Sequence, residues 1–250
     1  VHESSTWLSI RTGAKILAEG ALPRTEPFSY GAGGAAWSTH SWLADVLFAK
    51  LDALGGPGLL SALKSVVLAG GFALLLPINH GSPLVAATLL CLGACAGWAG
   101  FTETAACFDF LFFSLLLRLL RPRHRFQWPA AAAAAGLTVL WANLHGSMAP
   151  LALWLVGLKV FKASLRTATR ERLSYWAMMV ACVALQSWNP HGWGVVSHVF
   201  SDVAGSPDAW RTPLVSLYGV LAAAGFASCF FTLQQEFVTT LAATSVIVLS

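Results

Sequence analysis

Long apolar stretches separated by short polar segments dominate the chain from residue 59 onward. A helix needs about 20 mostly apolar residues to cross a bilayer. The pattern therefore predicts an all-α fold, a polytopic transmembrane helix bundle over residues 59–250 with about seven to eight spans. The predicted spans cover residues 59–79, 83–101, 105–120, 128–143, 147–162, 173–188, 213–232 and 237–250.

The first 58 residues follow a different pattern, in which apolar and polar positions alternate at helical spacing. Residues 6–18 and residues 40–54 each place apolar side chains on one face and charged side chains on another. Both segments predict amphipathic helices that lie at a membrane surface. The sequence Gly-Gly-Pro at residues 55–57 is expected to break the chain before the first span.

Composition supports a membrane protein. The chain is 56% hydrophobic and 10% charged, with a mean hydropathy of +0.67, whereas soluble domains are about 25% charged. This composition excludes a disordered protein, a nucleic-acid-binding domain and an ordinary cytosolic enzyme. Eleven Trp and fifteen Phe against three Tyr suit aromatic anchors at a bilayer interface. Membrane lipids are therefore expected partners, and nucleic acid is not.

Positive charge predicts an orientation. Counting crossings puts two basic clusters on the same side of the membrane, which the positive-inside rule makes cytoplasmic. Residues 1–58 and the loop 189–212 then face outward, and export of residues 1–58 is expected to need an upstream helix or signal segment. The clusters are Arg118, Arg121, Arg123 and Arg125, and Lys159, Lys162, Arg166, Arg170 and Arg172.

The five cysteines all lie inside apolar stretches, so no disulfide framework is predicted. Cys91 and Cys95 are four residues apart, a spacing that suits a metal pair. Because no histidine or acid lies within one turn of them, packing is the favoured interpretation.

Polar residues collect where the predicted spans end on the outer side. Residues 141–146 (Trp-Ala-Asn-Leu-His-Gly) and residues 188–193 (Trp-Asn-Pro-His-Gly-Trp) close two spans, and Glu103 lies in an outer turn. These groups either form a site for a polar head group above a lipid tail or simply cap helix ends at the interface. Asp109 lies within a span, where a carboxylate costs about 2.5 kcal/mol or more. It predicts either a functional group or a partner on a neighbouring helix.

Several of these segments together resemble a known family. They are Arg-Thr-Gly at 11–13, the stretch 16–30 that includes Leu-Pro-Arg-Thr-Glu-Pro-Phe-Ser-Tyr, Trp37, His40, Trp-Leu-Ala at 42–44, residues 141–147 and Asn-Pro-His-Gly at 189–192. In this order they resemble bacterial multi-pass proteins similar to C-type membrane glycosyltransferases. Relatives of that group include the protein O-mannosyltransferases and the lipid A aminoarabinose transferase.

The resemblance implies transfer of a sugar from a polyprenyl-phosphate carrier at the periplasmic side of a bacterial inner membrane. An acid in the first outer loop, here Glu3, would act as general base on the acceptor hydroxyl. Polar and basic groups would hold the carrier phosphate; a divalent metal serves some members only, and no metal ligand is predicted. The candidate substrate-binding residues are Arg11, Arg24, His40, Trp42, Glu103, Asn143, His145, Asn189 and His191.

The reactive segment departs from the family pattern. That pattern reads roughly Asp-Pro-Asp-x-Trp-x-His, and here Glu3 keeps one acid while Ser5 and Ser9 replace the second acid and the histidine. The alternative hypothesis is therefore an inactive protein of the same fold that serves as a subunit of a larger membrane complex. A transporter is a third class, disfavoured because Asp109 and Lys64 are the main ionisable residues within the predicted spans.

Overall fold

The computed structural model describes residues 4–29, 31, 34, 37–76, 83–96, 102–121, 125–165 and 167–194. Within these ranges the chain forms helices and no strand, which confirms the all-α prediction. The predicted spans 213–232 and 237–250 lie outside the described residues. The helices are α1 (Ser4–Glu19), α2 (Trp42–Leu75), α3 (Pro83–Ala96), α4 (Cys107–Leu119), α5 (Trp128–Leu144), α6 (Ala149–Ser164) and α7 (Thr169–Ala184), with 3₁₀ turns η3 (Gly146–Met148) and η4 (Leu185–Trp188).

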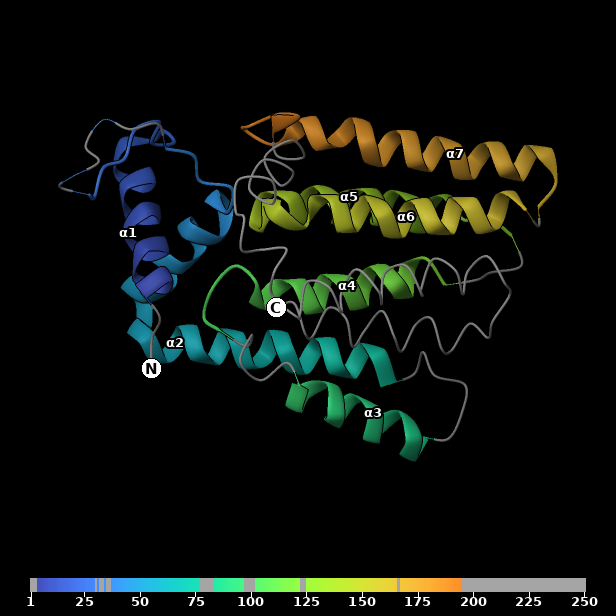
Figure 1. Cartoon of the computed structure of the whole chain (residues 1–250), viewed down its shortest axis with the longest axis horizontal. Helices are drawn as coiled ribbons and strands as arrows, with labels where there is room; N and C mark the ends of the chain where they lie inside the picture. The colour runs from blue at the N-terminus through green and yellow to red at the C-terminus, as the bar shows by residue number, and fades with distance from the viewer. Residues whose placement is uncertain are drawn as a thin grey trace.

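The bundle consists of the second part of α2 with α4, α5, α6 and α7, whose axes run nearly parallel (Figure 1). α1 crosses one end of the bundle and packs against α2. α1 confirms the helix expected over residues 6–18, and α2 joins the helix expected over residues 40–54 to the first apolar stretch.

α2 is interrupted at Gly56, as the Gly-Gly-Pro sequence predicts. Gly56 has φ 62° and ψ −160°, a conformation outside the helical region, and Pro57 follows it. Glycine adopts a positive φ without the steric cost that a Cβ imposes. The interruption lets the first part of α2 contact α1 while the second part packs along α4.

Two helical segments of the described chain are long and apolar enough to cross a membrane, namely Trp42–Leu75 and Gly146–Ser164. The helices α3, α4, α5 and α7 match predicted spans in position but have 13 to 17 residues. They are shorter than the roughly 20 residues of a typical span. The two apolar segments fit a membrane association, and crossing by the shorter helices stays a prediction.

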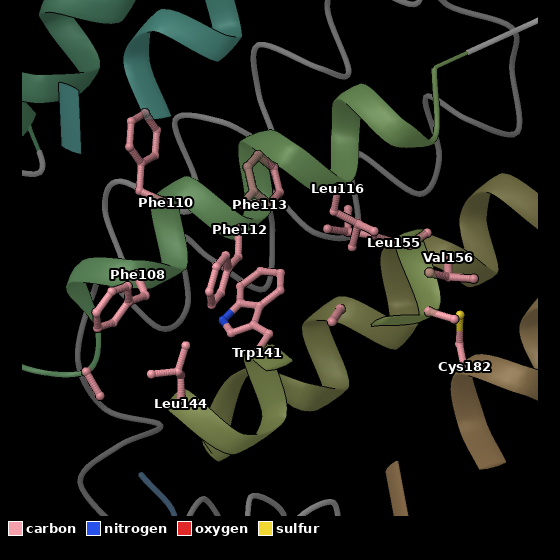
Figure 2. Packing of buried hydrophobic residues seen from close by; sticks show 14 of the residues in the cluster. Phe108, Phe110, Phe112, Phe113, Leu116, Trp141, Leu144, Leu155, Val156 and Cys182 are labelled. Carbon is pink, nitrogen blue, oxygen red and sulfur yellow. The ribbon is translucent and has the colours of Figure 1, made fainter. Parts of the chain in front are cut away.

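Aromatic side chains of α4 pack against α5 on one side and against α2 on the other, where the rings of Phe110 and Phe72 lie with centroids 4.6 Å apart. Phe110, Phe113 and Trp141 are almost completely buried, and the Trp141 ring meets the edge of Phe112 with centroids 6.0 Å apart (Figure 2). Large aromatic rings contribute much of the apolar area that a core of this size removes from its surroundings. Here they fix how α4 and α5 pack.

The cysteines of the described chain divide into two pairs. Cys107 and Cys182 are buried within the apolar core, whereas Cys91 and Cys95 on α3 are exposed. The packing interpretation concerned Cys91 and Cys95, and within the described residues their exposed side chains do not support it.

The described members of the two basic clusters lie at one end of the bundle. Arg118 lies in the last turn of α4, Lys162 in the last turn of α6, and Arg170 near the start of α7. These three helix ends lie together, at the end opposite to α1 (Figure 1). The described basic residues of both clusters therefore lie at the same end of the bundle, as counting the membrane crossings predicts. That this end faces the cytoplasm stays a prediction.

Candidate functional site

Three segments that are distant in sequence meet at the α1 end of the bundle. The Gly146 amide donates to the His40 carbonyl over 3.0 Å, and the Asn189 side-chain amide donates to the Ala142 carbonyl over 2.9 Å. His191 Nε2 lies 2.7 Å from the Thr39 carbonyl oxygen and donates to it. These bonds join the segment before α2, the end of α5 and the turn after η4. We call the side chains gathered there the polar cluster: His40, Trp42, Asp109, Asn143, His145, Asn189 and His191.

Ring contacts and side-chain hydrogen bonds fix the rim of the polar cluster. The rings of His40 and His191 lie with centroids 5.2 Å apart and planes inclined by 49°. The Trp42 indole donates to Asn143 Oδ1 over 2.9 Å, and Asn143 donates in turn to the Val139 carbonyl. The start of α2 is thereby tied to the end of α5.

Asp109 lies at the bottom of the polar cluster, in the first turn of α4, with 1% of its surface exposed. The buried Trp141 indole donates to its Oδ1 over 2.7 Å, and its Oδ2 lies 2.7 Å from Nδ1 of His145. Asp109 therefore pairs across to α5, which was one of its two sequence interpretations. A buried carboxylate with both oxygens hydrogen-bonded avoids most of the cost of an unpaired charge.

His145 lies between α5 and η3, outside the predicted spans 128–143 and 147–162. Burial disfavours its charged form, but the Asp109 carboxylate overcomes this effect through its charge and its hydrogen bond, so the pKa of His145 is raised above the ordinary value. An ionised carboxylate can only accept, so Nδ1 of His145 carries the shared hydrogen. Nε2 is then free to face a ligand, as an N–H donor when the ring is charged.

Glu103 belongs to a separate network beside α2. Its Oε1 accepts from Ser61 Oγ over 2.6 Å and from Lys64 Nζ over 3.1 Å. Its backbone carbonyl accepts from the Thr6 hydroxyl of α1. Glu103 thus connects α1, α2 and the turn before α4. Lys64, one of the two main ionisable residues within the predicted spans, has Glu103 as its partner. The described hydrogen bonds do not join Glu103 to the polar cluster.

The remaining candidate residues are not brought to the polar cluster. Arg11 on α1 and Arg24 in the following loop are exposed. In the part of the chain that the structure describes, no hydrogen bond joins either side chain to the cluster. Amphipathic spacing alone does not fix which way an exposed arginine points. Glu3, the predicted general base, lies outside the described residues.

The structure adds a supporting layer that sequence reasoning missed. The Thr39 hydroxyl donates to the buried Asp45 carboxylate over 2.6 Å, while the Thr39 carbonyl accepts from His191. Asp45 lies on the buried face of α2 against Gly13 of α1. The sequence pattern counted Asp45 among the polar positions of the amphipathic helix expected over residues 40–54, and the structure buries it instead.

Trp37, two residues before Thr39 in the chain, adds a buried donor. Its Nε1 is buried and makes no hydrogen bond within the described residues. The indole is a donor only, so an oxygen-bearing ligand is the natural partner for it. In sequence Trp37 stood out only as part of the family resemblance.

The polar cluster shows no sign of a metal centre. Among the described residues no group of three histidine, cysteine or acidic side chains could hold a metal ion. The groups available are hydrogen-bond donors, one buried Asp–His pair and two imidazole rings in tilted contact.

Comparisons of the chain with protein-family models, with curated proteins and with solved structures found no match.

Proposed function

We propose that this chain is a multi-pass protein of the bacterial inner membrane that transfers a sugar from a polyprenyl-phosphate carrier to an acceptor at the outer face. In this proposal the bundle has about seven to eight spans, α1 and the start of α2 lie at the periplasmic surface, and the polar cluster holds the carrier phosphate. The observation that carries the proposal is the buried Asp109–His145 pair at the end of the bundle, in which the carboxylate favours the charged, donating form of the imidazole.

His145 and Trp37 are the proposed phosphate contacts. A charged imidazole and an indole N–H both donate, and hydrogen bonds from an ionised donor to phosphate are roughly twice as strong as neutral ones. Asp109 acts through His145 and is therefore a positioning residue. His191, held by Thr39 and lying beside His40, borders the same space.

The transfer step needs a base for the acceptor. The acceptor oxygen forms a bond to the anomeric carbon, and the bond from that carbon to the phosphate oxygen breaks with its electron pair leaving on polyprenyl phosphate. The acceptor proton passes to a carboxylate, and the family resemblance gives that part to Glu3. A glutamate can act as general base when it reaches the hydroxyl within hydrogen-bond distance.

Glu3→Gln tests the proposed base. In proteoliposomes loaded with bacterial polyprenyl-phosphate sugars, the variant is expected to lose transfer, measured as release of polyprenyl phosphate, by about 10²-fold or more. Glu19→Gln is the matched control, because it makes the same chemical change at an exposed residue of the same segment and should keep wild-type activity. A Glu3→Gln protein as active as wild type would exclude this mechanism.

A second candidate function is that of a catalytically inactive subunit in a larger membrane complex. The observation that favours it is that several polar groups at the bundle end satisfy one another, as Trp42 does with Asn143 and Asn189 with the Ala142 carbonyl. Such bonds stabilise helix ends without any ligand. This candidate predicts an inactive wild-type protein, stoichiometric partner proteins after purification and no retained carrier lipid.

A further inference from the structure

The basic end of the bundle contains a shallow, open hollow of about 310 Å³, a volume that includes the open solvent at its mouth. It lies between the end of α4, the segment 125–127, the start of α5, and one face each of α6 and α7. This is the end opposite to the polar cluster (Figure 1). The hollow is lined by Leu119, Leu120, Arg121, Arg125, Phe126, Gln127, Ala130, Ala131, Lys159, Tyr175 and Met178.

Three cationic side chains come to this hollow, two from the connection between α4 and α5 and one from α6. Arg121 follows α4, Arg125 lies in the next described segment, and Lys159 comes from the last part of α6. No acidic residue is among the lining residues. Residues separated by more than thirty positions in sequence are thereby focused on one opening, which a random scatter of surface charge would not produce.

Aromatic contacts hold the walls of the hollow in place. Phe126 meets the edges of both Trp128 and Tyr175, with centroids 4.9 Å and 4.8 Å apart. The Lys159 ammonium lies 5.5 Å from the centroid of the Tyr175 ring, within cation–π range. The nearby Glu171 on α7 accepts the Phe126 backbone N–H, so its carboxylate anchors the segment to α7.

The chemistry of the lining fits a phosphate group attached to an apolar body. Arginine guanidinium groups present paired donors that match phosphate oxygens, and lysine adds a point charge. Leucine, alanine and methionine side chains supply an apolar floor beside them. Around this end the large side chains of Trp128, Leu165 and Trp176 are exposed, as is common for residues at a bilayer interface.

We propose that this hollow binds the phosphate headgroup of an anionic phospholipid, with Arg121, Arg125 and Lys159 as the phosphate contacts. Basic pockets between membrane helices commonly hold such headgroups. The proposal requires that the chain lie in a membrane and does not depend on sugar transfer. A soluble phosphate compound has the same recognising chemistry, and the competition described below separates the two sources.

Native mass spectrometry of the full chain in detergent, with added phosphatidylglycerol or phosphatidylcholine, tests the proposal. Wild type is expected to retain phosphatidylglycerol and to retain phosphatidylcholine at least tenfold less. The double variant Arg121→Gln/Lys159→Gln should lower phosphatidylglycerol retention by roughly a hundredfold or more, since it removes two hydrogen bonds from ionised donors.

Two controls make the outcome decisive. Arg170→Gln/Arg172→Gln removes the same charge from exposed side chains at the same end that do not line the hollow, and it should leave retention within about twofold, because exposed charge at this end contributes little to a specific contact. If the double variant misfolds, Arg125→Gln replaces it, because the Arg125 side chain is exposed. Equal losses in the hollow and control variants, or equal retention of both lipids, would overturn the proposal.

A competition experiment with inorganic phosphate or glycerol 3-phosphate distinguishes a lipid ligand from a soluble one. If the lipid is the true ligand, millimolar concentrations of either leave most of the phosphatidylglycerol bound. Complete displacement at such concentrations would assign the site to a soluble phosphate and contradict the lipid assignment.

Discussion

Replacing Asp109 by alanine is expected to lower the free energy of unfolding by about 3–5 kcal/mol, the cost of removing one partner from a buried ion pair. Two donors depend on this carboxylate, the Trp141 indole and the His145 ring, and the indole is fully buried. Thermal unfolding of the purified chain in detergent measures the loss. An unfolding temperature within a degree or two of wild type would mean that Asp109 does not hold α4 and α5 together.

Asp109→Asn is the matched variant that separates folding from binding. The amide oxygen still accepts from Trp141, so the bundle is expected to stay folded with a smaller loss of stability. The amide has no negative charge, so His145 loses the group that raises its pKa and is mostly neutral near pH 7. Carrier retention should then fall by roughly tenfold to a hundredfold, the value of one charged hydrogen bond. Unchanged retention would remove Asp109 from the proposed positioning role.

Gly13→Ala is expected to have the second large effect, because α1 approaches α2 too closely there for any side chain. A Cβ at Gly13 would lie 1.9 Å from the Asp45 carbonyl oxygen and 2.4 Å from its carbon. Backbone atoms cannot move aside as a flexible side chain does, so the helices must separate. We expect destabilisation at or above the usual overpacking cost of about 1–3 kcal/mol, measured by thermal unfolding.

The same substitution is expected to reach the polar cluster through contacts already described. Asp45 holds Thr39, and the Thr39 carbonyl holds His191, so moving Asp45 should loosen His191 and lower carrier retention. Gly136→Ala on α5 is the control, since a Cβ there meets nothing within 4 Å. Removing an exposed helix glycine should stabilise the chain by up to about 1 kcal/mol. Equal effects of Gly13→Ala and Gly136→Ala on the unfolding temperature and on carrier retention would show that α1 does not pack against α2 at Gly13.

Local sequence patterns predict the helices well. The Gly-Gly-Pro break, the amphipathic helix over residues 6–18 and the apolar stretches all depend on neighbours within a few turns. Those that fall within the described residues appear as helices near the predicted positions. Lengths were less predictable, because polar residues such as Thr102 and Thr104 begin a turn before α4 and shorten the helix. For this reason the described α4 is shorter than the stretch 105–120 expected to span.

The partners of the polar residues depend on tertiary packing and were only partly predictable. The sequence places Asn143, His145, Asn189 and His191 at the same end of the bundle, and the structure brings them together. The sequence does not predict that Asp109 faces His145. A shift of one residue along a helix turns a side chain by about 100°, so the neighbour of a carboxylate depends on how the helices pack. Arg11, Arg24 and Glu103 are predicted on the same membrane side as the polar cluster, but no described hydrogen bond joins them to it. Lying on the same side of a membrane does not bring two residues within contact distance.

The most direct test of the central claim is extraction and mass analysis of the lipids retained by the purified chain, in wild type and in His145→Gln/His191→Gln. The account predicts about one polyprenyl-phosphate lipid per chain for wild type, with retention lost as the pH rises through the raised pKa of His145 and its ring becomes neutral. The double variant should retain far less than wild type at every pH below that pKa. A folded wild-type protein that carries no polyprenyl phosphate, or a double variant that retains it fully, would contradict the proposal that the polar cluster holds the carrier.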